Sequence, residues 1–337
     1  MDIKKTLMRL SEQSAVGTVK TAADTAYEIL SKYARTEKTD NLTVIGFIKG
    51  ASDKTLMLDA HIDEVAMIVT DVDDSGFITV AKSGGIDLRT LPAARVTVHG
   101  KRDIKAVFCS TPPHLSSVEA EYDDISKLKI DTALGSKAKE IVSVGDYVTY
   151  DVQPVSLFEN IVTGKSLDDR AGVVCLLELA ERLSDKKLPH NVAFVLSDGE
   201  ELGLRGSKTA TFSVEPDEAI AIDVSFGDGP DISPDDCGKV SHGAMIGISP
   251  VLDKEISRRL CECAEELGNE YQTEVMGGRT GTNGDVISVT KGGVRTGIVS
   301  IPLRNMHTGA ELVDVRDIAN VCDILEKYIL SGGVLGD

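Results

Sequence analysis

Apolar residues recur every three or four positions in two segments near the start of the chain, residues 3–13 and 21–34. This spacing gathers the apolar side chains on one face of a helix, so both segments are predicted helices. The next two apolar runs, residues 41–50 and 54–63, are short and contain β-branched side chains, which favours strands. The chain is therefore expected to begin with two helices and two strands.

Helical periodicity becomes scarce between residues 69 and 162. Short β-like runs are separated here by glycine, proline and aspartate. The clearest of these runs are residues 76–81, 94–100, 105–110 and 146–152. Short runs with turn residues between them predict a small β-rich unit.

Helix and strand patterns alternate after Gly164. Helices are expected at residues 168–185, 249–268 and 314–330, and strands at residues 191–198, 218–226 and 295–303. This alternation predicts an α/β fold, with a mixed, mostly parallel sheet sandwiched by helices. The helix at 249–268 is expected to have Ser249 as its N-cap and Pro250 as its first helical residue.

The β-rich unit interrupts the α/β pattern instead of following it. We therefore expect one discontinuous domain formed by residues 1–68 and 163–337, with residues 69–162 inserted as a second, smaller domain. A chain of 337 residues is long enough for such a division.

Composition and charge narrow the possible partners. The formal net charge of −18 repels nucleic-acid phosphates, so no nucleic-acid partner is expected. No apolar run approaches the roughly eighteen residues that span a bilayer, and residues 1–14 lack the apolar segment of a signal peptide. The six cysteines show no C-x-x-C spacing. We expect a cytoplasmic protein without a membrane partner.

Acidic residues and histidines follow several of the predicted strands or open a helix. They are His61 and Asp63, Asp168 and Asp169, Glu200 and Glu201, Asp223, and His307. Singly, each has an ordinary structural explanation, such as a helix N-terminus or a turn. The carboxyl ends of parallel strands meet at one edge of a sheet, however, and sites form there. Together these residues predict a functional site at that edge.

Imidazole and carboxylate are ligands of Zn²⁺ and related transition metals. Two histidines and several carboxylates exceed the needs of one ion, so a pair of ions sharing a bridging carboxylate is the favoured interpretation. Three ligating carboxylates and a hydroxide would balance the four positive charges of two divalent ions. A neutral centre of this kind can be buried.

Two adjacent carboxylates with different roles explain the pair Glu200 and Glu201. Glu201 can bind one metal ion while Glu200 accepts the proton of the attacking water. Two nearby cations would keep both groups ionised despite their mutual repulsion. Asp63 lies two residues after His61, on the same face of an extended segment, and can orient its imidazole.

Several motifs in this order resemble those of the tetrahedral aminopeptidases, dinuclear metallo-aminopeptidases of the glutamyl-aminopeptidase or endoglucanase-like type. The matching segments are LDAHIDEVAMIV, KSLDDRAG, GEELGLRG, AIDV and GVRTGIVSIPLRNMHTGAE. SGGIDLRTLPAARV and the segment Pro112–His114 resemble the inserted domain of that family.

The resemblance implies a zinc-exopeptidase-like fold with an inserted, PDZ-like β-barrel that mediates dimerisation. It implies that Asp168 bridges two divalent ions, Zn or Co, in each subunit, that Glu200 is the general base and that Asp63 orients His61. It further implies dimers that assemble into a homo-oligomeric dodecamer. The metal ligands carried over from the family are His61, Asp168, Glu201, Asp223 and His307.

Four positions depart from the pattern of the family: Gly199, Phe226, Asn283 and Asn305. None of them removes a ligand or the base. Several are expected to line the pocket that sets substrate preference.

The predicted function is a metal-dependent aminopeptidase that acts on short peptides. A metal-dependent deacylase or a glycosidase-type hydrolase on the same scaffold is one alternative, and a glycosidase would need a carboxylate pair but no metal. A non-catalytic assembly protein that keeps the fold is the other. Such a protein should have lost a ligand or the base, and the sequence retains all of them.

Overall fold

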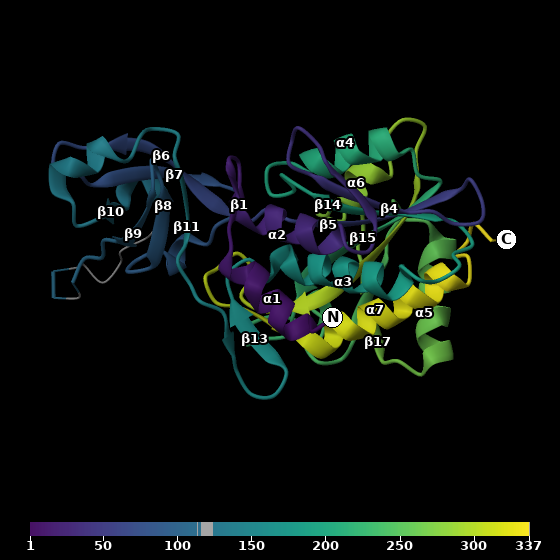
Figure 1. Cartoon of the computed structure of the whole chain (residues 1–337). Coiled ribbons are helices and arrows are strands. Elements are labelled where there is room, and N and C mark those ends of the chain that lie inside the picture. Colours follow the sequence, from purple (N-terminus) through teal and green to yellow (C-terminus); the bar gives the residue numbers. More distant parts are fainter. Residues whose placement is uncertain (113, 116–123, 337) are drawn as a thin grey trace.

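The computed structural model describes residues 1–112, 114–115 and 124–336, so Pro113 of the Pro112–His114 segment lies outside it. A small β unit stands beside a larger α/β unit (Figure 1). No helix in the described part of the chain is long and apolar enough to cross a membrane.

The larger unit is built on an eight-stranded sheet with the order β17-β16-β18-β15-β5-β14-β4-β3. Its strands are β3 (Arg35–Lys38), β4 (Val44–Ile48), β5 (Thr55–His61), β14 (Asn191–Ser197), β15 (Glu218–Phe226), β16 (Ala244–Ile248), β17 (Tyr271–Val275) and β18 (Arg295–Leu303). The four central strands β18, β15, β5 and β14 are parallel to one another. Strands β4 and β3 add antiparallel pairs at one edge, and β16 pairs antiparallel with β18. The expected mixed, mostly parallel sheet is confirmed.

Helices cover both faces of this sheet (Figure 1). One face carries α1 (Ile3–Glu12), α2 (Thr21–Leu30), α3 (Leu167–Leu183), α5 (Lys254–Leu267) and α7 (Val315–Leu330), and the other carries α4 (Arg205–Val214) and α6 (Gly284–Ile287). Successive strand residues point to opposite faces. On β5, Leu58 packs in the core beneath α3, whereas Met57 packs in the core beneath α4 and α6.

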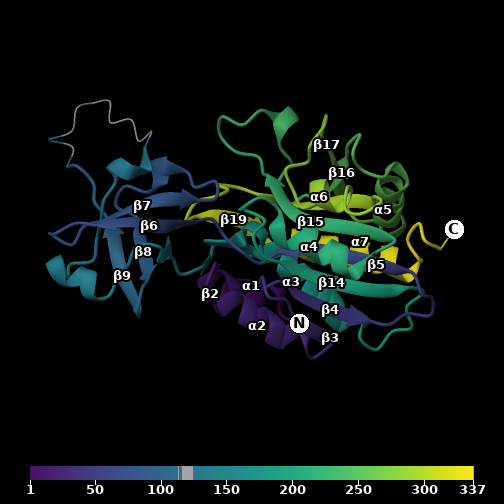
Figure 2. The same ribbon diagram turned by 90° about the horizontal axis from the view of Figure 1, so that it is seen from above.

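The smaller unit is a closed barrel with the strand order β10-β7-β6-β11-β8-β9. Its strands are β6 (Ala66–Val72), β7 (Ile78–Ser83), β8 (Arg95–His99), β9 (Asp103–Phe108), β10 (Ile130–Asp131) and β11 (Tyr147–Tyr150). Its own apolar core includes Met67, Ile78 and Val98. The barrel is inserted after β5 and projects from the end of the α/β unit (Figure 2). An inserted β-barrel is therefore confirmed, while the boundaries 69 and 162 and the role in dimerisation stay predictions.

A three-stranded sheet joins the return from the barrel to the C-terminal part of the chain. Strand β13 (Ile161–Gly164) pairs with β12 (Val155–Ser156) and β19 (Glu311–Asp314). Gly164 is the register partner of Glu311. This pairing brings the start of α3 next to the turn that follows β18.

The remaining elements are short. They are the strands β1 (Ala15–Val16) and β2 (Val19–Lys20) and the 3₁₀ helices η1 (Leu88–Thr90), η2 (Ile125–Lys127), η3 (Gly135–Glu140) and η4 (Pro234–Asp236).

The predicted start of α5 is wrong. The helix begins at Lys254, and its N-cap is Asp253, which accepts hydrogen bonds from the backbone N–H groups of Glu255 and Ile256. The Ser249 hydroxyl instead donates to the carbonyl of Gly278. Asp253 is in addition fixed by an ion pair with Arg295, which lies at the start of β18. This contact from a distant strand helps to hold the capping side chain in place.

Candidate metal centre

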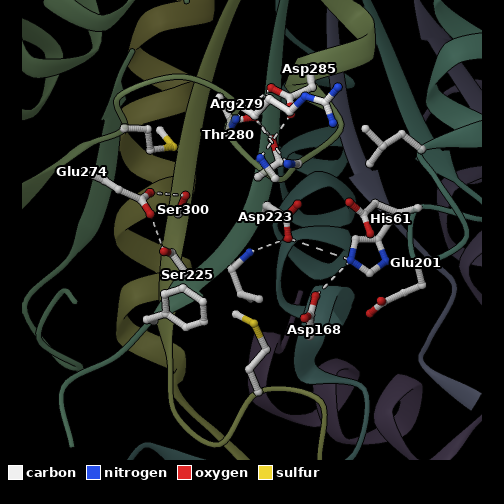
Figure 3. Close-up of a pocket in the computed structure, with 18 of the residues that line it drawn as sticks. His61, Asp168, Glu201, Asp223, Ser225, Glu274, Arg279, Thr280, Asp285 and Ser300 are labelled. Atoms are coloured by element: carbon white, nitrogen blue, oxygen red, sulfur yellow. Dashed lines mark hydrogen bonds and ion pairs between the residues drawn. The ribbon is translucent and has the colours of Figure 1, made fainter. Parts of the chain in front are cut away.

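One pocket, with a volume of about 580 Å³, collects six of the seven predicted site residues (Figure 3). His61 ends β5, Glu200 and Glu201 follow β14, Asp223 lies in β15, and His307 follows β18. Asp168 lies at the start of α3 and also lines this pocket. Asp63, the seventh, is buried directly beside His61. The sheet edge thus brings together residues from five parts of the chain.

The Asp168 carboxylate lies between the two imidazoles. Its Oδ1 is 3.0 Å from Nε2 of His61, and its Oδ2 is 3.3 Å from Nε2 of His307. Glu201 Oε1 is 3.2 Å from the same nitrogen of His307. Asp223 Oδ1 is 3.9 Å from Nε2 of His61. The Nε2 atom of each imidazole therefore faces two carboxylates, and Asp168 is common to both sets.

Each imidazole also faces an oxygen atom from its other nitrogen, and at His307 this contact is a hydrogen bond. His61 Nδ1 lies 3.4 Å from Asp63 Oδ1, and His307 Nδ1 lies 3.0 Å from the carbonyl oxygen of Gly85. A Cβ at Gly85 would come within 2.6 Å of that nitrogen, so the close approach requires glycine. A neutral ring that donates Nδ1–H to Gly85 turns its Nε2 lone pair towards Asp168 and Glu201. Outer hydrogen bonds of this kind orient metal-ligating histidines.

Burial and charge shift the pKa values of these groups strongly. Burial raises the pKa of Glu200 to about 7, with the charge of Glu201 adding to the increase. Burial also raises the pKa of Asp223 well above its usual value. Burial opposes the charged form of His307, but hydrogen bonds to Asp168 and Glu201 raise its pKa to about 11. The imidazoles in turn lower the pKa of Asp168 despite its burial.

The donor set fits divalent cations. Three groups of side chains have ligand atoms within 4.8 Å of one another, and they are His61 with Asp169 and Asp223, His61 with Glu200 and Glu201, and Asp168 with Glu201 and His307. In the described chain, the ion pairs of Asp168, Glu201 and Asp223 are all with imidazoles and not with lysine or arginine. Burying carboxylates without matching positive charge is costly, and bound cations would remove that cost.

Asp169 belongs to one of these groups, and each of its oxygens also accepts a backbone hydrogen bond. Oδ2 accepts the backbone N–H of His61, and Oδ1 accepts that of Gly172. The peptide between Asp168 and Asp169 is cis, and both residues have non-helical backbone angles although they fall within the bounds of α3. Asp169, which the sequence places at this edge without a specific role, positions the backbone at His61 through the hydrogen bond to its Oδ2.

Glu311 was missed by sequence reasoning. This buried carboxylate accepts the backbone N–H groups of Leu167, Asp168 and His307. It therefore fixes two predicted ligands through the main chain. Burial raises its pKa to about 8, and the charge of Asp168 adds to the increase. Only its place in the segment HTGAE, close to His307, could have drawn attention to it.

A second buried network was also missed. Glu64 accepts hydrogen bonds from Lys165, Ser166 and the backbone N–H of Ala15. Arg170 donates to the carbonyl oxygen of Leu10. These contacts connect α1, the start of α3 and the segment after His61.

Of the four departures from the family pattern, only Phe226 lines this pocket. The expectation that several of them do so is wrong. Asn283 is buried and donates its amide hydrogens to Asp59 and Ser197. Asn305 donates to the carbonyl of Ala310, and Gly199 lines a separate pocket beside Asp198. None of these three residues lines this pocket: Asn283 is buried, Asn305 is exposed, and Gly199 faces a different pocket.

Known proteins are similar to this chain in both sequence and fold. The family described as M42 glutamyl aminopeptidase matches residues 43–324. The lysyl aminopeptidase of Pyrococcus furiosus is 31% identical, over 91% of this chain and 90% of its own. An aminopeptidase structure from Desulfurococcus kamchatkensis superposes with a TM-score of 0.91 at 29% identity, covering 98% of this chain and 94% of the other.

The TET1 peptidase of Pyrococcus horikoshii, which can assemble into a tetrahedron or a large octahedral shell, is also similar. It superposes with a TM-score of 0.87 at 26% identity, covering 98% of this chain and 99% of its own.

Proposed function

The chain belongs to the M42 glutamyl aminopeptidase family, hydrolases that act on peptide bonds, and from that premise we propose that it removes N-terminal residues from short peptides at the pocket around Asp168. The observation that carries the proposal is the position of the Asp168 carboxylate, with one oxygen towards each of two imidazoles. A carboxylate shared between two ligand sets is suited to bridge the two ions of a dinuclear centre.

The residues that would hold two divalent cations, Zn or Co, divide into two sets. His61 and Asp223 would hold one, Glu201 and His307 the other, and Asp168 both. When bound, such ions lower the pKa of water and polarise the scissile carbonyl. Zn and Co accept the same ligands, so supply as well as affinity decides which is bound.

Glu200 is proposed as the general base. Its carboxylate lines the pocket beside the residues that would hold the ions, where it can reach a water bound between them. It would take the proton of the attacking water and deliver it to the amine that leaves. Asp63 assists by fixing the backbone of Glu200 and facing His61.

Self-assembly is proposed from the relatives. Because the Pyrococcus horikoshii peptidase forms closed shells, we infer that this chain is a homo-oligomer in which dimers build a dodecamer, with the barrel in the dimer contact. Light scattering coupled to gel filtration tests this through the mass. A mass of one or two subunits would contradict it.

The function is tested with a panel of aminoacyl-anilide substrates before chelation, after chelation and after addition of Zn²⁺, Co²⁺ or Mn²⁺. Free aminoacyl substrates should be hydrolysed, N-acetylated counterparts should not, and chelation should abolish turnover until metal is restored. Preference for the acetylated substrates would favour a deacylase. Glycosidase activity that survives chelation would favour the metal-independent hydrolase, and no turnover of any substrate would favour the assembly protein.

A further inference from the structure

A carboxylate outside the predicted site projects into the same pocket. Glu274 lies on β17, and its side chain accepts hydrogen bonds from the hydroxyls of Ser225 on β15 and Ser300 on β18 (Figure 3). The bond from Ser300 is 2.9 Å long and ends on Oε2, whereas the bond from Ser225 ends on Oε1. The carboxylate is thus fixed by two other strands.

These hydroxyls place Glu274 next to the predicted metal ligands. Ser300 is the register partner of Asp223, and Ser225 follows Asp223 by two residues on the same face of β15. All four residues line the pocket. The wall that contains Glu274 therefore adjoins the cluster at which the amine and the scissile carbonyl of a substrate would lie.

The charge of Glu274 has no partner in the described part of the chain. No lysine, arginine or histidine there forms a salt bridge with it, although it neighbours a strongly acidic cluster. A carboxylate has about four lone-pair sites, and the two serines use two of them. The remaining sites are free to accept hydrogen bonds from a ligand.

Apolar side chains border this carboxylate. Phe226 follows Ser225, Met276 lies two residues after Glu274, and both line the pocket. A lysine or arginine side chain combines an apolar stem with a charged end. Apolar walls beside an unpaired carboxylate match that combination.

We propose that Glu274 selects peptides whose N-terminal residue is basic, lysine or arginine, and this inference rests on the proposed aminopeptidase function. The stem of the N-terminal side chain packs along Phe226 and Met276, and its cationic end donates hydrogen bonds to the carboxylate of Glu274. Ser225 and Ser300 hold the carboxylate in place before the substrate arrives.

Arg279 is the competing determinant because it lines the same pocket and carries the opposite charge. It is exposed, and it lies in the segment between β17 and α6. Asp285 lies close to Arg279 in Figure 3. Its carboxylate accepts hydrogen bonds from Thr280 and Gly281, and no ion pair joins it to Arg279 in the described part of the chain. If Arg279 rather than Glu274 set the preference, acidic N-terminal residues would be favoured.

The test compares kcat/KM for lysyl-, arginyl-, leucyl- and glutamyl-anilides in the wild-type metal-loaded protein, in Glu274→Gln and in the matched variant Arg279→Gln. We expect the wild type to favour lysyl and arginyl over glutamyl substrates. Glu274→Gln should lower the lysyl-to-leucyl ratio about 10- to 100-fold, the range expected for losing a charged hydrogen-bond partner. Arg279→Gln should leave that ratio within about threefold of the wild type. Metal content and thermal midpoint confirm that each variant is folded and loaded.

Two results would overturn the inference while leaving the proposed function intact. One is a wild type that hydrolyses leucyl or glutamyl substrates but neither basic one. The other is a Glu274→Gln variant in which lysyl and leucyl rates fall equally. If no aminoacyl-anilide were hydrolysed by the wild type, the result would instead contradict the aminopeptidase function itself.

Discussion

Asp63 holds Glu200 through the main chain: Oδ1 of Asp63 accepts the backbone N–H of Glu200 at 3.0 Å. The second oxygen of Asp63 accepts the backbone N–H of Glu201 at 3.2 Å, and the same carboxylate faces His61. One buried carboxylate thus sets the direction of the turn that carries the proposed base and a proposed ligand.

Replacing Asp63 with asparagine should lower kcat/KM by about 10- to 100-fold, the usual cost of losing a group that orients ligands. An asparagine amide can accept only one of the two N–H groups and turns a donor towards the other. The measurement is kcat/KM on a cleaved anilide together with metal affinity. Asp198→Asn is the matched control because Asp198, which follows β14, comes directly before the same turn and its side chain accepts neither N–H group. Equal losses in both variants would contradict the proposed role.

Substitutions of the neighbours Glu200 and Glu201 should have different effects on metal binding and turnover. Glu200→Gln should keep its metal ions but lower kcat by about 10²- to 10⁴-fold, because the proton carrier is gone. Glu201→Gln should lose metal, since an amide is a weaker ligand than the carboxylate that faces His307. Elemental analysis beside steady-state kinetics separates the two. Near wild-type turnover in Glu200→Gln would rule out Glu200 as the base.

Asp168→Ala should leave at least one metal position empty. Asp168 faces both imidazoles, so its loss removes an oxygen ligand from each set. Metal analysis after dialysis measures the ratio of ions to subunits. Asp103→Ala, an exposed acid of the barrel, serves as the control. Two ions per subunit in Asp168→Ala would contradict the bridging assignment.

Stability should depend on pH through Glu218, far from the metal centre at the start of β15. Burial raises the pKa of this carboxyl to about 7, although Tyr328 donates a hydrogen bond to it. A raised pKa in the folded state means that the stabilising contribution is complete below about pH 4.5 and is lost as the pH rises through 7.

Glu218→Gln cannot ionise and should escape this loss. Relative to wild type, its free energy of unfolding should therefore increase by about 2.5 kcal/mol between pH 5 and pH 8. Urea unfolding of both proteins at the two pH values measures the difference. An offset that does not change with pH would show that Glu218 does not titrate in this range.

Much of the fold could be predicted because local patterns and the sheet agree. The alternation of helices and strands after Gly164 predicted three of the central parallel strands, the apolar run 54–63 predicted the fourth, β5, and the short β runs predicted the barrel. At the start of α5, Ser249 and Asp253 are both residue types that cap helices, and the ion pair between Asp253 and Arg295 on another strand is not visible in the sequence. Sequence proximity carries no information about such a contact.

By itself, the sequence determined which residue types stand at the ends of the strands, and hence the chemistry available there. His61, Asp223 and His307 could be expected to converge because parallel strands place their carboxyl ends at one edge. Only the tertiary structure decided which groups hold that cluster in position and what surrounds it. The Glu311 carboxylate accepts the backbone N–H of His307, and the backbone carbonyl of Gly85 contacts the His307 ring. Glu274, on another strand of the sheet, also lines the pocket. Contacts of this kind depend on the distance between folded segments, which the order of residues along the chain does not record.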